Sequence, residues 1–119
     1  MATVLSTVGK QYIVDKLDSS VSTKLEYIAW GTGAGTAAVG DTTLFTEASE
    51  ARTLGTLSQP SADTLRCVGT IVATGSKTIT NAGTFTASSA GTLGVKGDFT
   101  GIVMATNDQI TFTIDLQIT

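Results

Sequence analysis

The most regular pattern of hydrophobic and polar residues lies at the C-terminal end of the chain. Every second residue from Ile110 to Ile118 is apolar, and every residue between them is polar. A period of two is that of a β-strand with one face in a hydrophobic core and the other in water. Asn107 and Asp108, directly before this run, favour a turn. The pattern therefore predicts a strand over residues 110–118 that packs on the core with one face.

Shorter apolar runs, separated by turn residues, fill most of the remaining chain. They predict strands over the ranges 25–30, 52–57, 65–74, 78–87, 92–96 and 99–105. Turns are expected at Gln59-Pro60-Ser61, Gly75-Ser76-Lys77 and Ser88-Ser89-Ala90-Gly91. The run 65–74 is apolar on both faces, which favours a central position in a sheet. Strands at roughly ten-residue spacing indicate a mainly β fold, a single antiparallel β-sandwich or jelly-roll-like domain.

Residues 1–22 differ from the rest, because lysine and aspartate mix there with apolar residues and glycine is nearly absent. The spacing predicts a helix of about 12 residues capped by Thr3 or Ser6. Two apolar faces are expected, the first with Val4, Val8 and Tyr12, the second with Ile13, Leu17 and Val21. An extended arm is the alternative, because the apolar stripe drifts. We expect this N-terminal helix or arm to belong to the same domain as the sandwich, residues 23–119.

A second, shorter helix is predicted after the glycine-rich segment 31–35. Asp41 is a good N-cap residue, so one or two helical turns are expected over residues 42–47. Leu44 and Phe45 are then the side chains that anchor this element in the core.

Composition supports the β assignment. The chain has 119 residues, of which 23 are Thr, 13 are Gly and one is Pro. Threonine favours strands and glycine favours tight turns. Charged residues make up 14%, against about 25% in a typical soluble protein. A surface with so few charges has little protection against association, which is tolerable where neighbouring subunits cover it.

Charge and residue types exclude several classes of function. The net charge of −3 and the seven scattered basic residues argue against nucleic acid as a partner. No apolar run in the sequence is long enough to span a membrane, and the N-terminal residues lead us to expect no secretory signal. The chain has no histidine, which removes the commonest general base and metal ligand. The single cysteine, Cys67, is expected to be a small buried side chain in a strand.

The remaining candidates for chemistry are weak. The segment 31–35 has glycines at alternate positions and matches no phosphate-binding motif, so a mobile surface loop is expected. Glu47 and Glu50 lie near Arg52 in the sequence, which favours an Arg–Glu pair or a solvated loop over a pair of catalytic carboxylates. Asp98, Asp108 and Asp115 are too scattered for a calcium site. We therefore predict no catalytic, cofactor-binding or metal-binding residue and no enzyme.

Trp30 is the remaining residue of interest. A lone tryptophan at the end of a strand is usually part of the core, although in an oligomer it can anchor an interface.

Three stretches together resemble a group of small bacteriophage virion proteins. They are Trp30-Gly31-Thr32-Gly33-Ala34-Gly35-Thr36 continuing to Gly40-Asp41-Thr42-Thr43-Leu44 and Glu47, then Ile79-Thr80-Asn81-Ala82-Gly83-Thr84-Phe85, then Phe99-Thr100-Gly101-Ile102-Val103 with Asn107-Asp108-Gln109-Ile110-Thr111-Phe112-Thr113. The resemblance covers about residues 27–119. The chain is similar to proteins described as head decoration (cement) proteins or as tail-fibre-like β-sandwich proteins. The motifs that carry the resemblance are structural and not catalytic.

The resemblance implies a virion component made in the bacterial cytoplasm. A chain of this size looks most like a decoration protein that binds the outer surface of the capsid, often as a homotrimer, with the major capsid protein as its partner. A tail adaptor or a tail-fibre-base protein, with tail proteins as partners, is the alternative. A carbohydrate-binding module is a third, less favoured interpretation. Residues 1–22 are the candidate contact with the capsid or a sister subunit, so deletion of residues 1–20 is expected to abolish decoration.

Overall fold

The computed structural model describes all residues, 1–119, and is mainly β with one short helix. The elements in chain order are β1 (Thr3–Leu5), α1 (Thr7–Leu17), β2 (Tyr27–Gly31), β3 (Thr53–Leu54), β4 (Thr56–Ser61), β5 (Thr64–Val72), β6 (Lys77–Phe85), β7 (Leu93–Met104) and β8 (Gln109–Gln117). All strand pairs are antiparallel, as the sequence predicts.

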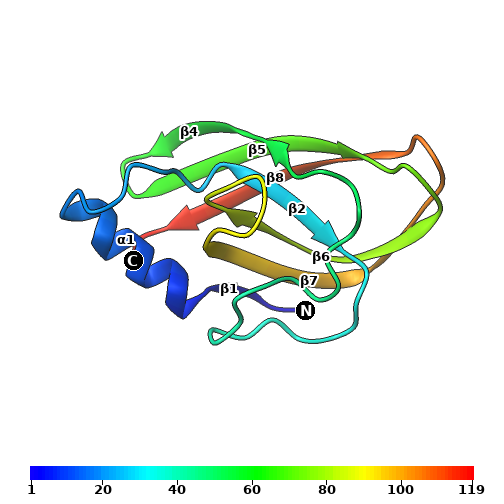
Figure 1. Ribbon diagram of the computed structural model, residues 1–119, viewed down its shortest axis with the longest axis horizontal. Coiled ribbons are helices and arrows are strands. Elements are labelled where there is room, and N and C mark those ends of the chain that lie inside the picture. The colour runs from blue at the N-terminus through cyan, green and yellow to red at the C-terminus, as the bar shows by residue number, and fades with distance from the viewer.

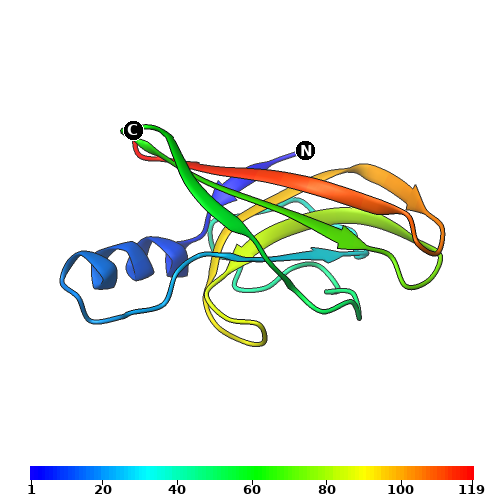
Figure 2. The same cartoon turned by 90° about the horizontal axis from the view of Figure 1, so that it is seen from above.

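The strands form two sheets that face each other (Figures 1 and 2). The larger sheet has the order β1-β7-β6-β2-β3, and the smaller has the order β4-β5-β8. The predicted central run, residues 65–74, is β5, the middle strand of the smaller sheet. This arrangement is compatible with a β-sandwich.

The core between the sheets is small and centres on Trp30, which is 1% exposed. Its ring meets the ring of Phe112 edge-on, with 6.3 Å between centroids. Phe112 belongs to β8, whose alternate residues are half-buried and exposed in the predicted order. The C-terminal pattern is therefore confirmed as one face on the core and one in water.

The N-terminal segment contains a helix, and Ser6 is its cap. The Ser6 hydroxyl accepts a hydrogen bond from the Gly9 amide at 2.9 Å and donates one to the Leu93 carbonyl at 2.7 Å. It therefore satisfies a free amide at the start of the helix and ties α1 to β7. Tyr12 is buried, but Leu17 is 83% exposed, so the expected second buried face is wrong.

The short helix predicted over residues 42–47 is absent. The Asp41 carboxylate accepts hydrogen bonds from the Ala38 amide and from Lys96, and so does not cap a helix that follows it. Leu44 is buried at 5% exposure, as predicted, while Phe45 is only half-buried.

Three strand boundaries also differ from the prediction. The expected strand 52–57 is interrupted at Gly55, between β3 and β4, where the chain passes from one sheet to the other. The turn expected at residues 59–61 lies instead at residues 62–63, because β4 is an edge strand and tolerates Pro60 beside a bulge. The strands expected over 92–96 and 99–105 form one strand, β7, since Asp98 pairs with Asn81 across the sheet.

Candidate functional site

The two glutamates singled out from the sequence have different partners. Glu50 is enclosed: its carboxylate accepts hydrogen bonds from Trp30 Nε1 at 3.0 Å and from the Thr74 amide at 2.9 Å, and it forms an ion pair with Lys77. Burial raises the pKa of Glu50, but the hydrogen bonds from Lys77, Thr74 and Trp30 outweigh it and bring the pKa to about 2. A carboxylate that is fully paired and ionised has no proton to exchange with a substrate.

Arg52 and Glu47 form the predicted Arg–Glu pair. Two hydrogen bonds of 2.9 and 3.0 Å join the guanidinium to the carboxylate. The same guanidinium donates to the carbonyls of Ala87 and Ala90 and lies 3.7 Å from the centre of the Phe85 ring. Arg52 therefore holds the 88–91 turn against the sandwich, which is a structural task.

Lys96 is a buried charge that sequence reasoning missed. Its side chain is 1% exposed, donates to Asp41 at 2.9 Å and to the Thr43 carbonyl at 2.8 Å, and lies over the ring of Phe45. Hydrogen bonds from the Ala38 amide and then from Lys96 lower the pKa of Asp41. All these partners belong to the irregular segment 37–45, so Lys96 fastens that segment to β7.

The other aspartates lie apart from one another. Asp98 accepts hydrogen bonds from the amides of Ala37 and Ala2, Asp108 from the Ala105 amide, and Asp115 is paired with Arg66 on the exposed face of β8. No group of three Cys, Asp or Glu side chains gathers closely enough to hold a metal ion. The structure also contains no helix of the length and hydrophobicity that a membrane span requires.

The glycine-rich segment 31–35 is not a free loop. The amides of Thr32 and Gly33 donate to the carbonyls of Thr46 and Phe45, at 3.0 and 2.9 Å. A Cβ atom at Gly31 would lie 2.5 Å from the Phe45 carbonyl oxygen, so only glycine fits this approach. The expectation of a mobile surface loop is therefore wrong for its first half, because its amides are already occupied.

Trp30 and Cys67 are core residues, as predicted. Cys67 is 2% exposed, and burial raises the pKa of its thiol to about 11, with a further contribution from the charge of Glu26. A thiol that stays protonated at neutral pH is a poor nucleophile. The near-complete burial of Trp30 removes it as an interface anchor.

The first exposed apolar surface lies at the end of the molecule that carries α1 (Figure 1). Val14 and Leu17 of the helix are 58% and 83% exposed. Beside them is a cleft of about 390 Å³ between α1 and the ends of β4, β5 and β8, lined almost entirely by apolar side chains. Lys16 and Lys24 are the only charged residues among those that line it. We call this the helix-end cleft.

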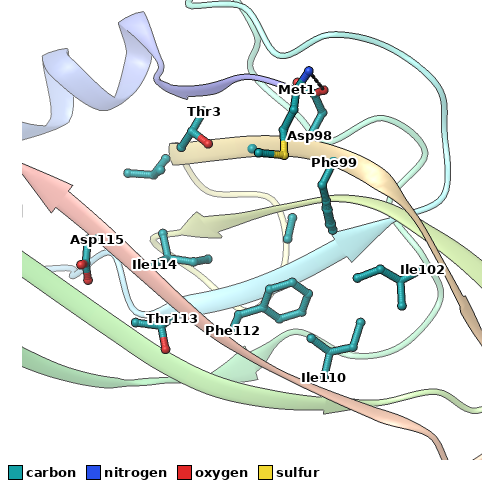
Figure 3. Close-up of a pocket in the computed structure, with 13 residues that line it drawn as sticks. Met1, Thr3, Asp98, Phe99, Ile102, Ile110, Phe112, Thr113, Ile114 and Asp115 are labelled. Atoms are coloured by element: carbon teal, nitrogen blue, oxygen red, sulfur yellow. Dashed lines mark ion pairs between the residues drawn. The ribbon is translucent and has the colours of Figure 1, made fainter.

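The second apolar surface is a cleft of about 400 Å³ between β7 and β8. Figure 3 shows Phe99 and Ile102 of β7 facing the same space as Ile110, Phe112 and Ile114 of β8. The ring centroids of Phe99 and Phe112, which both line it, are 6.4 Å apart. We call this the β8 cleft. It is the side on which the two sheets do not close.

Sequence reasoning did not find either cleft. The alternation in β8 shows which residues face inward, but not that β8 lies at the edge of its sheet. Comparison of the chain with protein-family models, curated proteins and solved structures finds no match. The molecule therefore offers two apolar surfaces for contact, while its enclosed charges all have structural partners.

Proposed function

We propose that the protein is a bacteriophage head decoration protein, which binds the outer surface of the assembled capsid and stabilises the shell. The observation that carries the proposal is the helix-end cleft, with exposed Val14 and Leu17 beside it. The resemblance of residues 27–119 to phage virion proteins supports the same class of function. Glu50, Arg52 and Lys96 all form intramolecular ion pairs that hold the fold together, which fits a protein that acts by binding and not by catalysis.

The helix-end cleft has the properties of a protein-binding surface. Contiguous apolar area is unfavourable in water by about 25 cal/mol per Å², and a partner that covers it recovers that free energy. Leu17 projects where a coat subunit can enclose it, and Lys16 and Lys24 can pair with acidic groups around the contact. This location agrees with the sequence-based hypothesis that residues 1–22 contact the capsid.

Capsid stabilisation then follows from mass action. A protein that binds only the assembled shell stabilises it by RT ln(1 + [L]/Kd) at each site, where [L] is its free concentration. Because a shell has many equivalent sites, small contributions add over many copies. We favour a homotrimer as the bound form, as the resemblance implies.

The test uses single substitutions, because deletion of residues 1–20 would also remove buried Ser6 and Tyr12 and endanger the fold. Purified protein is mixed with undecorated capsids of its phage, and the capsids are pelleted. We expect the wild type to pellet at hundreds of copies per capsid. Leu17→Glu should weaken binding at least tenfold, because it places a charge in the apolar contact.

Val103→Glu is the matched control, since Val103 is 81% exposed and lies on β7 near the opposite end of the molecule. It should bind like the wild type. Equal binding by Leu17→Glu would remove the helix-end cleft as the contact. Failure of the wild type to bind capsids, with binding to tails at about a dozen copies or to glycans, would replace the proposal with one of its alternatives. Light scattering of the free protein tests the trimer.

A further inference from the structure

One edge of β8 has no partner along its whole length. Antiparallel strands direct the backbone groups of alternate residues to opposite sides. The amide of Ile118 donates to Asp63, and the carbonyl of Asp108 accepts from Ala73, so the even-numbered residues face β5. The amides and carbonyls of the odd-numbered residues therefore face away from β5: Gln109, Thr111, Thr113, Asp115 and Gln117. No other strand pairs with β8.

This edge lacks the features that protect exposed strands. Proteins shield such edges with short strands, prolines, bulges or lysines. The other edges of the two sheets have them: β1 and β3 are only three and two residues long, and β4 carries Pro60 and a bulge. In contrast, β8 is nine residues long, pairs with β5 without a bulge, and contains neither proline nor lysine.

The polar side chains of β8 also leave the edge open. The hydroxyl oxygens of Thr111 and Thr70 are 2.7 Å apart, and the Asp115 carboxylate accepts hydrogen bonds from Arg66. The side-chain amide of Gln117 donates to the Asp63 carboxylate. All three side chains lean toward β5 and its preceding turn, away from the free edge. The charge of Asp115 is neutralised in the same way, so it repels no incoming strand.

The β8 cleft lies beneath this free edge. Three inward-facing residues at alternate positions, Ile110, Phe112 and Ile114, form one wall of it. Phe99 and Ile102 of β7 form the other, and Ile102 is 41% exposed although it faces inward. The larger sheet continues past β8 with β7 and β1, so its inner surface is left uncovered where a fourth strand of the smaller sheet would lie.

A second copy of the sandwich does not fit this edge. Two copies of β8 that pair antiparallel in one sheet are related by a twofold axis perpendicular to that sheet. The larger sheets of both copies then lie on the same side of the joined smaller sheets. That side already contains β7 and β1, which extend beyond β8. The second larger sheet would therefore collide with the first. Only a segment free of its own sandwich can lie there.

We propose that the free edge of β8 accepts an extended segment of another polypeptide as a fourth strand of the smaller sheet. Main-chain hydrogen bonds to the odd-numbered residues would provide affinity, and alternate side chains would provide specificity. The segment carries three apolar residues at alternate positions, which match the three apolar residues of β8 that line the β8 cleft: Ile110, Phe112 and Ile114.

The test uses a synthetic peptide with the sequence of residues 109–117 flanked by two lysines at each end. Placed antiparallel about Thr113, it sets its Phe112 opposite Ile114 of the protein and its Ile114 opposite Phe112, while its polar residues lie on the wet face. We expect binding with a Kd in the micromolar range by calorimetry. The same peptide with its four inward apolar residues, those from positions 110, 112, 114 and 116, changed to serine should not bind.

Two protein variants locate the binding. Ile102→Gln places an amide in the β8 cleft and should weaken peptide binding at least tenfold. Its matched control is Val103→Gln, the next residue on the same strand, which does not line the cleft and should bind normally. Thr113→Pro removes one outward amide, spares the bonds to β5, and should also weaken binding at least tenfold.

Circular dichroism verifies that each variant is folded. Absence of binding at a peptide concentration of about 1 mM would overturn the proposal, because a Kd above this value means that the edge has little affinity for an extended segment. Equal binding by Ile102→Gln and Val103→Gln would also overturn it. A wild-type oligomer that Thr113→Pro converts to a monomer would assign the edge to a second copy instead. These measurements use no capsids, so they stand or fall independently of the decoration experiment.

Discussion

Each buried charge in this protein is enclosed by partners from distant parts of the chain. Lys96 meets Asp41, and Glu50 meets Lys77 and Trp30. No buried side-chain nitrogen or oxygen lacks a hydrogen-bond partner. Such groups stabilise one arrangement of loops over others, because removal of one partner leaves the other charge buried and unpaired.

Glu50→Gln tests this at a single residue. The folded-state pKa of Glu50, about 2, lies below its ordinary value of 4.5. Its contribution is therefore complete above about pH 5 and is lost as pH falls toward 2. We expect Glu50→Gln to lower the free energy of unfolding by about 3 kcal/mol at pH 7 and by much less at pH 3. Urea denaturation at both pH values measures this, and an equal loss at both would contradict it.

At the scale of elements, the passage of the chain from β3 to β4 closes one side of the sandwich. Gly55 lies at this passage, and its amide donates to the Glu26 carbonyl at 2.7 Å. A Cβ atom there would lie 2.4 Å from the sulfur of Cys67. The two strands can therefore cross between the sheets only because position 55 has no side chain and position 67 has a small one.

The pair predicts a coupled effect on stability. Gly55→Ala should cost about 2 kcal/mol of unfolding free energy, because the methyl group overlaps the Cys67 sulfur. In a Cys67→Ala background the same substitution should cost less than half as much, since the sulfur is gone. Urea denaturation of the two single variants and the double variant completes the cycle. Additive losses would show that the sulfur is not the obstacle.

The elements illustrate what the sequence can predict. The strict alternation of residues 110–118 predicts β8, and Ser6 is one of two caps expected for the helix. The helix predicted over residues 42–47 is wrong, because the carboxylate of Asp41 accepts a hydrogen bond from Lys96, which is 55 residues away in the chain. Pro60 misleads because it signals a turn in the sequence, whereas an edge strand accommodates it. Contacts between distant residues decided both cases, and a local pattern does not contain them.

The candidate surfaces were predictable only in part. The sequence predicts residues 1–22 as a contact segment, which stays a prediction, and Leu17 within this segment is 83% exposed. The β8 cleft depends on the order of strands in both sheets, which leaves β8 at an edge above β7. Strand order follows from the packing of the whole chain and has no signature in any one segment.

For the whole molecule, charge predicts an unusual dependence of stability on pH. The chain has no histidine, and the raised pKa of Cys67, about 11, keeps its thiol neutral at pH 7. Several carboxyl groups, among them Asp41, Asp63 and Asp98, have pKa values below their ordinary range. Their contributions are present above the unfolded-state pKa and are lost as pH falls through the folded one.

Because the chain has no histidine, the urea midpoint should be nearly constant between about pH 5.5 and 7 and fall steadily below about pH 5. A series of denaturation curves across this range measures it. A midpoint that changes as much between pH 5.5 and 7 as it does below pH 5 would contradict this expectation.

The three direct passages of the chain between the sheets are unevenly placed. One is at Gly55 on the closed side, and the other two, residues 73–76 and 105–108, join neighbouring strands at the end opposite α1 (Figures 1 and 2). Neither the free edge of β8 nor the end that carries α1 has such a covalent tie. The covalent connections therefore restrain separation of the two sheets least where the two clefts lie. A polypeptide bound in either cleft would act as the missing tie.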